Sequence, residues 1–259
     1  MNPLFVDFHS KILGKKMPMY VYLPENHEKF KSLPVLYFLH GRNGNENIMF
    51  DAGINAKADE LINRGIIKPM MIVCPRIENS RGLNSAIECR EVLNSESRIY
   101  NVGRYEDYLI KELIPFVDNT YNTINDRKGR FAGGASAGGY AALHNALRHQ
   151  DMFSRVGGHM PAIELKLEEE DRPHFPDKET WDKYDPINIA KNEGLSLDIQ
   201  VYLDAGDKDE GGFYEGCSIL QNILEEKGIN SQNHIFPGHH NTEYIQSNIE
   251  KYLIFYGSE

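Results

Sequence analysis

Residues 130–149 read RFAGGASAGGYAALHNALRH, and this stretch decides the fold. Its first part is short and strand-like, its middle is rich in glycine, and its last part has the pattern of a helix. The turn contains G-x-S-x-G, with Ser136 at the centre. A serine in a strained turn between a strand and a helix projects its hydroxyl into the open, and glycines two residues before and after it leave room for close packing. The segment therefore predicts an exposed, reactive Ser136.

The helix expected after Ser136 predicts a place for negative charge. The first N–H groups of a helix have no partner within it, and the helix dipole favours an anion there. We expect the backbone N–H of Ala137 to donate to an oxyanion formed beside Ser136. The alternative is a glycine-rich turn in which Ser136 has no catalytic role. A phosphate-binding loop is disfavoured, because no Lys-Ser or Lys-Thr follows the turn and G-x-G-x-x-G is not met.

Short apolar runs alternate with helical patterns along the rest of the chain. Strands are expected at 4–9, 19–23, 35–39, 70–74, 130–133, 198–203 and 234–236, and helices at 55–63, 104–117, 137–149, 214–226 and 242–255. The alternation predicts an α/β fold, with a mostly parallel central sheet flanked by helices, in a single domain over residues 1–259. Residues 161–192 are acidic, proline-bearing and aromatic, and we expect them to form a small insertion over the site.

The composition of the chain excludes some classes of binding partner. The formal net charge is −10, which argues against binding to nucleic acid or to an anionic membrane surface. The three cysteines form no C-x-x-C pair, as is typical of a reducing compartment. The sequence has no signal-peptide pattern and no run of about 18 apolar residues, which favours a cytoplasmic location. We therefore expect a small-molecule substrate, with a homo-oligomer left open.

A glycine-bearing loop, His40-Gly41-Arg42, follows the strand expected at 35–39. In an α/β arrangement of this kind, such a loop supplies a second N–H to the oxyanion. We favour the backbone N–H of Arg42, with that of Gly41 as the alternative. His40 is a candidate for substrate binding and, less favoured, for the catalytic base.

The acid and the base are expected late in the chain, in the order Ser, Asp or Glu, His. The strand at 198–203 runs into a loop with three candidate acids, Asp204, Asp207 and Asp209. The last strand is followed by His239 and His240, and either could be the base. Position alone does not separate these alternatives. Adjacent histidines are poorly placed to hold one metal ion, so we expect no metal and no cofactor.

With these residues assembled, the chain resembles the esterase D and feruloyl-esterase branch of the α/β hydrolases. The segments that carry the resemblance are MYVYLP (19–24), LHG (39–41), YEDY (105–108), ELIP (112–115) and GASAGGYAAL (134–143). In that family the acid usually follows a turn glycine by three residues, and the base follows a glycine-rich turn and precedes Asp or Asn. The resemblance therefore implies Asp209 as the acid and His240 as the base. The chain departs from the family pattern at His239 and at residues 158–162.

The resemblance and the residues together imply a serine carboxylic-ester hydrolase that forms an acyl-enzyme on acetyl, feruloyl or other small acyl esters. An acyltransferase or peptidase with the same residues is the main alternative, and a non-catalytic binding protein on this scaffold is the second. The side chains expected to contact substrate besides His40 are His159, Trp181, Tyr184 and Phe175.

Overall fold

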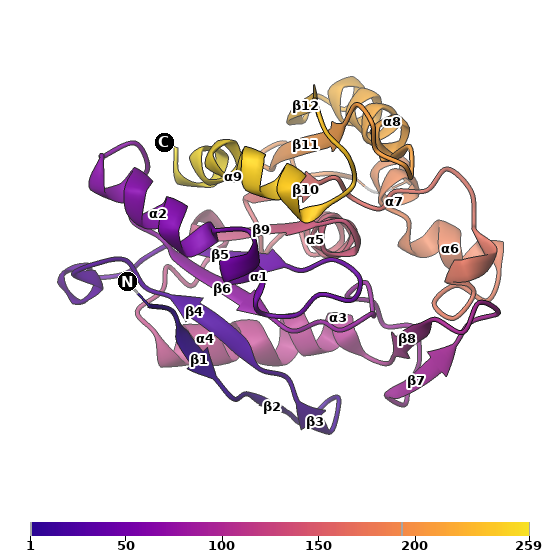
Figure 1. Cartoon of the computed structure of the whole chain (residues 1–259), viewed down its shortest axis with the longest axis horizontal. Helices are drawn as coiled ribbons and strands as arrows, with labels where there is room; N and C mark the ends of the chain where they lie inside the picture. The colour runs from indigo at the N-terminus through magenta and orange to yellow at the C-terminus, as the bar shows by residue number, and fades with distance from the viewer. Residues whose placement is uncertain (1, 193, 259) are drawn as a thin grey trace.

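The computed structural model describes residues 2–192 and 194–258, whose strands form one eight-stranded sheet in the order β1-β4-β6-β5-β9-β10-β11-β12 (Figure 1). The strands of this sheet are β1 (Leu4–Val6), β4 (Met19–Tyr22), β5 (Val35–Leu39), β6 (Met71–Pro75), β9 (Arg130–Ala135), β10 (Arg155–His159), β11 (Gln200–Gly206) and β12 (Asn230–Phe236). The pairs β1–β4 and β4–β6 are antiparallel, and all pairs from β6 to β12 are parallel. The expectation of a mostly parallel sheet is confirmed.

The central strands are apolar on both faces because both faces are covered. In β5, Val35 and Tyr37 belong to one hydrophobic cluster, whereas Leu36 and Phe38 belong to another. Successive side chains of a strand point to opposite faces, so a continuous apolar run is what a doubly covered strand requires.

Helices form a layer on each face of the sheet (Figure 1). The helices are α1 (Ile48–Asp51), α2 (Ile54–Asn63), α3 (Tyr105–Asp107), α4 (Ile114–Thr120), α5 (Ala137–Arg148), α6 (Lys178–Tyr184), α7 (Pro186–Asn192), α8 (Phe213–Glu226) and α9 (Thr242–Gly257), and a π-helical turn, Tyr108–Leu113, joins α3 to α4. Apolar residues of α2 and α9 cover one face, and those of α4, α5, α7 and α8 cover the other. In the part of the chain that the structure describes, no helix is long and apolar enough to cross a membrane.

Two small antiparallel pairs lie outside the main sheet. One joins β2 (His9–Ser10) to β3 (Lys15–Lys16), and the other is a hairpin of β7 (Arg90–Leu93) and β8 (Ile99–Val102). The hairpin and β10 have no counterpart among the strands expected from sequence. In the short hairpin β7 is largely exposed and β8 is buried over residues 100–102, and β10 contains two adjacent glycines, so none of these strands shows a clear apolar pattern.

Residues 161–192 are only partly the expected insertion. A short 3-10 turn, Glu169–Asp171, and α6 lie on the same side of the molecule as the β7–β8 hairpin (Figure 1). The last part, α7, instead packs against α5 and α8 and belongs to the main helical layer. Its buried Ile187, Ile189 and Ala190 supply the apolar contact that this packing needs.

Candidate active site

Ser136 lies in a strained turn between β9 and α5. Its backbone has φ 55° and ψ −120°, outside the usual regions for a residue with a side chain. A Cβ on Gly134 would lie 2.5 Å from the carbonyl carbon of Gly138, and one on Gly138 would lie 2.2 Å from the carbonyl oxygen of Leu39. Only glycine fits at these two positions, as the sequence pattern predicts. The backbone N–H of Ser136 donates to the carbonyl of His159 at 3.0 Å, which ties the turn to β10.

One hydrogen bond joins Ser136 to His240, and a second joins His240 to Asp209, both more than 70 positions later in the chain. His240 Nε2 lies 2.8 Å from Ser136 Oγ, and His240 Nδ1 lies 2.7 Å from Asp209 Oδ2. A carboxylate only accepts, so Nδ1–H donates to Asp209 and Nε2 is left to accept from the serine hydroxyl. Asp209 is fully buried, whereas about a fifth of the His240 side chain is exposed. The structure thus brings Ser136, Asp209 and His240 together in one chain of hydrogen bonds.

The neighbouring candidates hold the loops in place. Asp207 Oδ1 accepts from the backbone N–H of Gly238 at 2.9 Å. Glu210 accepts from the backbone N–H of His240 at 3.1 Å and pairs with the His239 ring at 2.7 Å. These backbone and ring contacts lower the pKa of Glu210 to about 2, so its carboxylate stays charged. Asp207, Glu210 and His239 therefore fix the distance between the two loops, and none of them is bonded to Ser136.

The loop after β5 lies directly against Ser136. A Cβ on Gly41 would lie 3.2 Å from the Ser136 Cβ. Within residues 2–192 and 194–258, no protein acceptor binds the backbone N–H of Arg42 or of Ala137, so both remain available to a ligand.

His40 holds this loop through its ring and is 1% exposed. Its Nε2 accepts from the backbone N–H of Ile77 at 3.0 Å, which leaves Nδ1–H to donate to the carbonyl of Gly41 at 2.8 Å. Burial lowers the pKa of His40 to about 4, so the ring is neutral at pH 7. Both ring nitrogens are occupied, which contradicts the alternative of His40 as the base and leaves little of the ring for a substrate.

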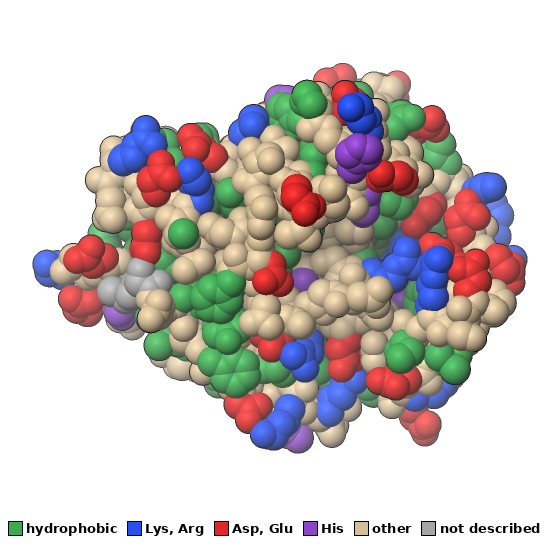
Figure 2. Space-filling view, in the orientation of Figure 1, with side chains coloured by type: hydrophobic (Ala, Val, Ile, Leu, Met, Phe, Trp, Pro, Cys, Tyr) green, Lys and Arg blue, Asp and Glu red, His purple; other side chains and the backbone are tan. Residues whose placement is uncertain are grey.

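Two cavities meet at Ser136, Arg42 and His240. The larger has a volume of about 510 Å³ and the smaller about 300 Å³. The hollow is visible in Figure 2, with Lys and Arg side chains gathered at one edge. The larger cavity is lined by Arg42, Asn79, Arg81, Arg98, Tyr100, Ser136, Ala137, Ala162, Glu164, Glu170, His174, Glu210, Gly211, Phe213 and His240.

Charged and polar side chains dominate this lining, and the sequence did not indicate the group around Arg81. Arg81 is buried and pairs with Glu164 at 2.7 Å and with Asp171 at 2.8 Å. Burial opposes the charge of Arg81, but the two carboxylates outweigh it and raise its pKa. Burial also raises the pKa of Asp171, against the opposing charge of Arg81. These residues come from the segment before β7 and from the insertion, where no periodic pattern marks them.

The expectation that His159 and Trp181 contact substrate is wrong. His159 is fully buried, and its ring nitrogens bond the Asp204 carboxylate and the Tyr256 hydroxyl, each at 3.0 Å. Trp181 packs in a buried cluster with Leu83 and Phe175. Tyr184 packs against the same cluster and donates its hydroxyl to the carbonyl of Asn84. Aromatic composition alone did not distinguish local packing from a cavity wall.

Comparison with known proteins identifies the family. Residues 10–256 match the model of the esterase family described as "Putative esterase", and the chain belongs to this family. It is 30% identical over 226 residues to an endo-1,4-beta-xylanase/feruloyl esterase of Xylanibacter ruminicola, covering 82% of this chain but only 28% of that protein. It is 26% identical over 260 residues to the S-formylglutathione hydrolase of Arabidopsis thaliana, covering 94% of this chain and 88% of that one.

Solved structures show the same fold. A ferulic acid esterase superposes with a TM-score of 0.81 at 22% identity, over 99% of this chain and 98% of the other. The S-formylglutathione hydrolase FrmB of Staphylococcus aureus superposes with a TM-score of 0.78 at 18% identity, over 99% of each chain. The fold is that of the α/β hydrolases, and the chain is a carboxylic ester hydrolase.

Proposed function

We propose that this chain is a serine esterase that works by two-step acyl transfer on Ser136. The observation that carries the proposal is the hydrogen-bonded chain from Ser136 Oγ through His240 to Asp209, with links of 2.8 and 2.7 Å, at the junction of two cavities. A nucleophile, a base within hydrogen-bond reach and a third group that orients the base are what this chemistry needs.

In the first step, the hydroxyl oxygen of Ser136 attacks the ester carbonyl while His240 Nε2 takes the hydroxyl proton. The imidazolium then gives that proton to the leaving alcohol or thiol, and the acyl group stays on Ser136. Water deacylates the serine by the same route in reverse. Asp209 holds the ring in the tautomer that leaves Nε2 free and stabilises the imidazolium.

The oxyanion is held by the backbone N–H groups of Ala137 and Arg42. Both lie beside Ser136 and have no protein acceptor among the described residues. A donor of this kind lowers the barrier by roughly 3 kcal/mol, because the negative charge develops only as the tetrahedral intermediate forms. His40 supports this arrangement by fixing Gly41, the residue before Arg42.

The two cavities allow the acyl group and the leaving group to lie on different sides of Ser136. Names of the relatives point to feruloyl esters and to a formyl thioester, so acetyl, feruloyl and other small acyl esters are the candidate substrates. The rings of Phe213 and His240 pack edge to face, with centroids 5.1 Å apart, and Phe213 supplies an apolar contact in the larger cavity.

The test is hydrolysis of p-nitrophenyl acetate by the wild type and by Ser136→Ala, together with labelling by a fluorophosphonate probe. We expect the variant to lose about 10⁴-fold or more in kcat/KM and all labelling, while its circular dichroism spectrum stays unchanged. Unchanged turnover would refute the role of Ser136. A wild type that neither turns over nor labels would favour a binding protein, and acceptor alcohols that outcompete water would favour an acyltransferase.

A further inference from the structure

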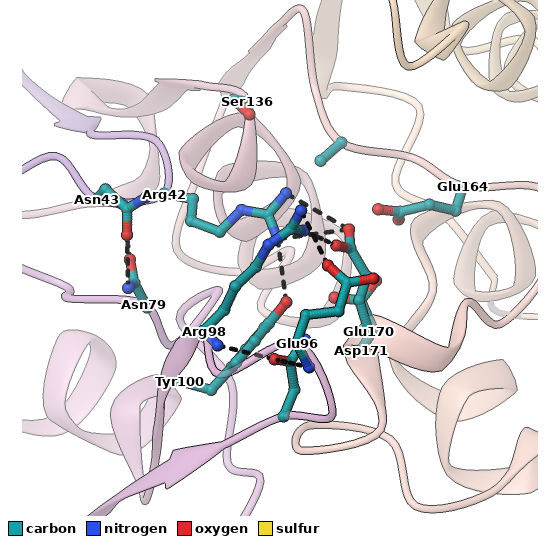
Figure 3. Close-up of polar contacts among 12 residues, drawn as sticks. Arg42, Asn43, Asn79, Glu96, Arg98, Tyr100, Ser136, Glu164, Glu170 and Asp171 are labelled. Carbon is teal, nitrogen blue, oxygen red and sulfur yellow. Dashed lines mark hydrogen bonds and ion pairs between the residues drawn. The ribbon is translucent and has the colours of Figure 1, made fainter.

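Three separate segments build one charged wall of the larger cavity. Arg42 comes from the loop after β5, Arg98 lies just before β8 in the hairpin, and Glu170 lies in the 3-10 turn of the insertion. Figure 3 shows the side chains of Arg42 and Arg98 pointing toward the carboxylate of Glu170, with Ser136 nearby. One Glu170 oxygen lies 3.4 Å from the guanidinium of Arg42, and the other accepts from Arg98.

The two arginines of this wall share one cavity carboxylate. Among the residues that the structure describes, Arg42 has a good hydrogen bond only to the hydroxyl of Tyr100, at 3.0 Å, since its contact with Glu170 is at the outer limit of hydrogen bonding. Arg98 has a second partner in Glu96 at 3.0 Å, but that pair is about half exposed. A guanidinium carries five N–H donors, so donors of Arg42 remain for a ligand. More than a third of the Arg42 side chain is exposed.

Arg81, deeper in the same cavity, shows what a fully paired arginine looks like. It is 6% exposed and bonds two carboxylates, Glu164 and Asp171, through four hydrogen bonds of 2.7 to 3.0 Å. Two carboxylates compensate its charge within the protein, so Arg81 has no need of a ligand as a partner. Arg42 and Arg98 differ because they face the opening and have one cavity carboxylate between them.

We infer that the larger cavity binds a part of the substrate that carries a carboxylate, which docks on Arg42 and Arg98 and displaces or joins Glu170. This inference rests on the proposed function and names the substrate class for the same site. A carboxylate matches the fork of a guanidinium, and bonds between two charged groups are stronger than neutral ones. Displacing Glu170 costs little, because partly exposed ion pairs contribute little to stability.

The chain as a whole carries a net charge of −10, so a negative substrate is attracted only by local charge. The pair of arginines beside Ser136 provides such a local charge at the mouth of the cavity. The same background disfavours anions elsewhere on the surface, so the preference for a carboxylate should depend on these two side chains.

Two matched pairs of esters test the inference, because the carboxylate could belong to either side of the ester. On the acyl side, mono-4-nitrophenyl adipate is compared with its methyl ester. On the leaving-group side, 4-acetoxybenzoate is compared with methyl 4-acetoxybenzoate. We expect the charged member of at least one pair to have a kcat/KM about tenfold higher at low salt, because hydrogen bonds to a charged group are worth that much. The advantage should shrink at 0.5 M NaCl.

Arg98→Gln is the decisive variant. It should bring the kcat/KM values of the charged and neutral esters to within about twofold of each other, through a loss of about tenfold for the charged ester. Arg98→Lys should keep part of the preference, and Glu170→Gln should increase it by removing the competing carboxylate. The matched control is Arg64→Gln, at the residue directly after α2, which removes a surface charge paired with Glu60 outside the cavity lining and should change nothing.

Equal or faster hydrolysis of the neutral member in both pairs would overturn the inference, and so would a preference that survives Arg98→Gln in a folded variant. Either result leaves the esterase proposal standing if Ser136→Ala abolishes turnover of the neutral esters. If the wild type hydrolyses none of the four esters, the proposed function itself fails.

Discussion

Two histidine–aspartate pairs lie near the carboxyl ends of β10, β11 and β12, and only one of them meets a cavity. His240 and Asp209 are 2.7 Å apart, and His159 and Asp204 are 3.0 Å apart. In both pairs Nδ1–H donates to the carboxylate, and Nε2 is left to accept from a hydroxyl. That hydroxyl belongs to Ser136 in the first pair and to Tyr256 in the second.

The two pairs differ in whether a cavity gives a ligand access to the histidine ring. His159 is fully buried, with its ring stacked 3.6 Å from the ring of Tyr252. Asp204 accepts further bonds from the hydroxyls of Tyr244, at 2.6 Å, and Tyr252, at 2.7 Å. This buried pair ties β10 and β11 to α9, which begins two residues after His240. A histidine–aspartate pair therefore stabilises the fold where it is buried, as at His159, and is accessible to a substrate where it opens on a cavity, as at His240.

The largest expected effect on catalysis comes from disrupting the His240–Asp209 pair, which opens on a cavity. Asp209→Asn should lower kcat by about 10⁴-fold, because the amide no longer holds the His240 ring in the productive tautomer. Asp207→Asn is the matched control, and it should cost less than about tenfold, since Asp207 only accepts from a backbone N–H. Steady-state kinetics with p-nitrophenyl acetate measures both. Equal losses in the two variants would leave the acid unassigned.

Disrupting the buried His159–Asp204 pair should affect stability more than catalysis. In Asp204→Asn, the amide group cannot accept all three donors, so buried donors lose their partner. We expect the free energy of unfolding, measured in urea, to fall by about 3 kcal/mol. The kcat of the folded variant should fall much less than that of Asp209→Asn. A loss of kcat as large as that of Asp209→Asn, with stability intact, would contradict the structural role.

Asp185 is another buried carboxylate, and it differs from Asp204 and Asp209 because it has few hydrogen-bond partners. One oxygen accepts from the backbone N–H of Asn188 at 3.0 Å, and the other has no partner among the described residues. Burial raises its pKa to about 7, above that of an unfolded carboxyl. The folded state therefore binds the proton more tightly, and this group costs stability as the pH rises from about 4 to about 7.

Asp185→Asn keeps the backbone contact and removes the titration. The variant should match the wild type at pH 4.5 and be more stable at pH 8, by on the order of 2 kcal/mol. Urea denaturation at the two pH values measures the difference. A variant that is destabilised equally at both would show that the ionised carboxylate is not strained in the wild type.

The smallest effect is expected from single hydroxyls of the sealed network. Tyr252→Phe removes one of the three donors to Asp204 and should cost about 1 kcal/mol in the free energy of unfolding. Tyr202→Phe is the control, because the Tyr202 hydroxyl is buried without a partner among the described residues. It should be neutral or slightly stabilising, and the reverse order would show that the donor to Asp204 contributes nothing.

Much of the fold could be predicted from local sequence. The strand at 35–39 has both expected ends, and the helix expected over 55–63 begins one residue earlier, at Ile54. The turn at Ser136 has the strained backbone and the close glycines that G-x-S-x-G predicts. Each of these signals lies within a window of about 10 residues. The short β7–β8 hairpin and the glycine-bearing β10 carry no such signal, and they were missed.

The spacing of residues along the sequence could not identify which acid and which histidine lie beside Ser136. Asp204, Asp207 and Asp209 lie within six residues, and only the resemblance to a family singled out Asp209. The structure gives the three carboxylates different surroundings, a sealed network, a backbone contact and the His240 ring. His159 carries a ring like that of His240 and is buried, which no local pattern revealed.

By itself the sequence determined most strands of the sheet, the strained turn and the expected order of the serine, the acid and the base, because backbone sterics and apolar periodicity act between near neighbours. Only the tertiary structure decided which histidine reaches Ser136 across 104 residues and which carboxylate lies between Arg42 and Arg98. Such contacts depend on how distant segments pack, and packing sets both the burial and the access of each charged group.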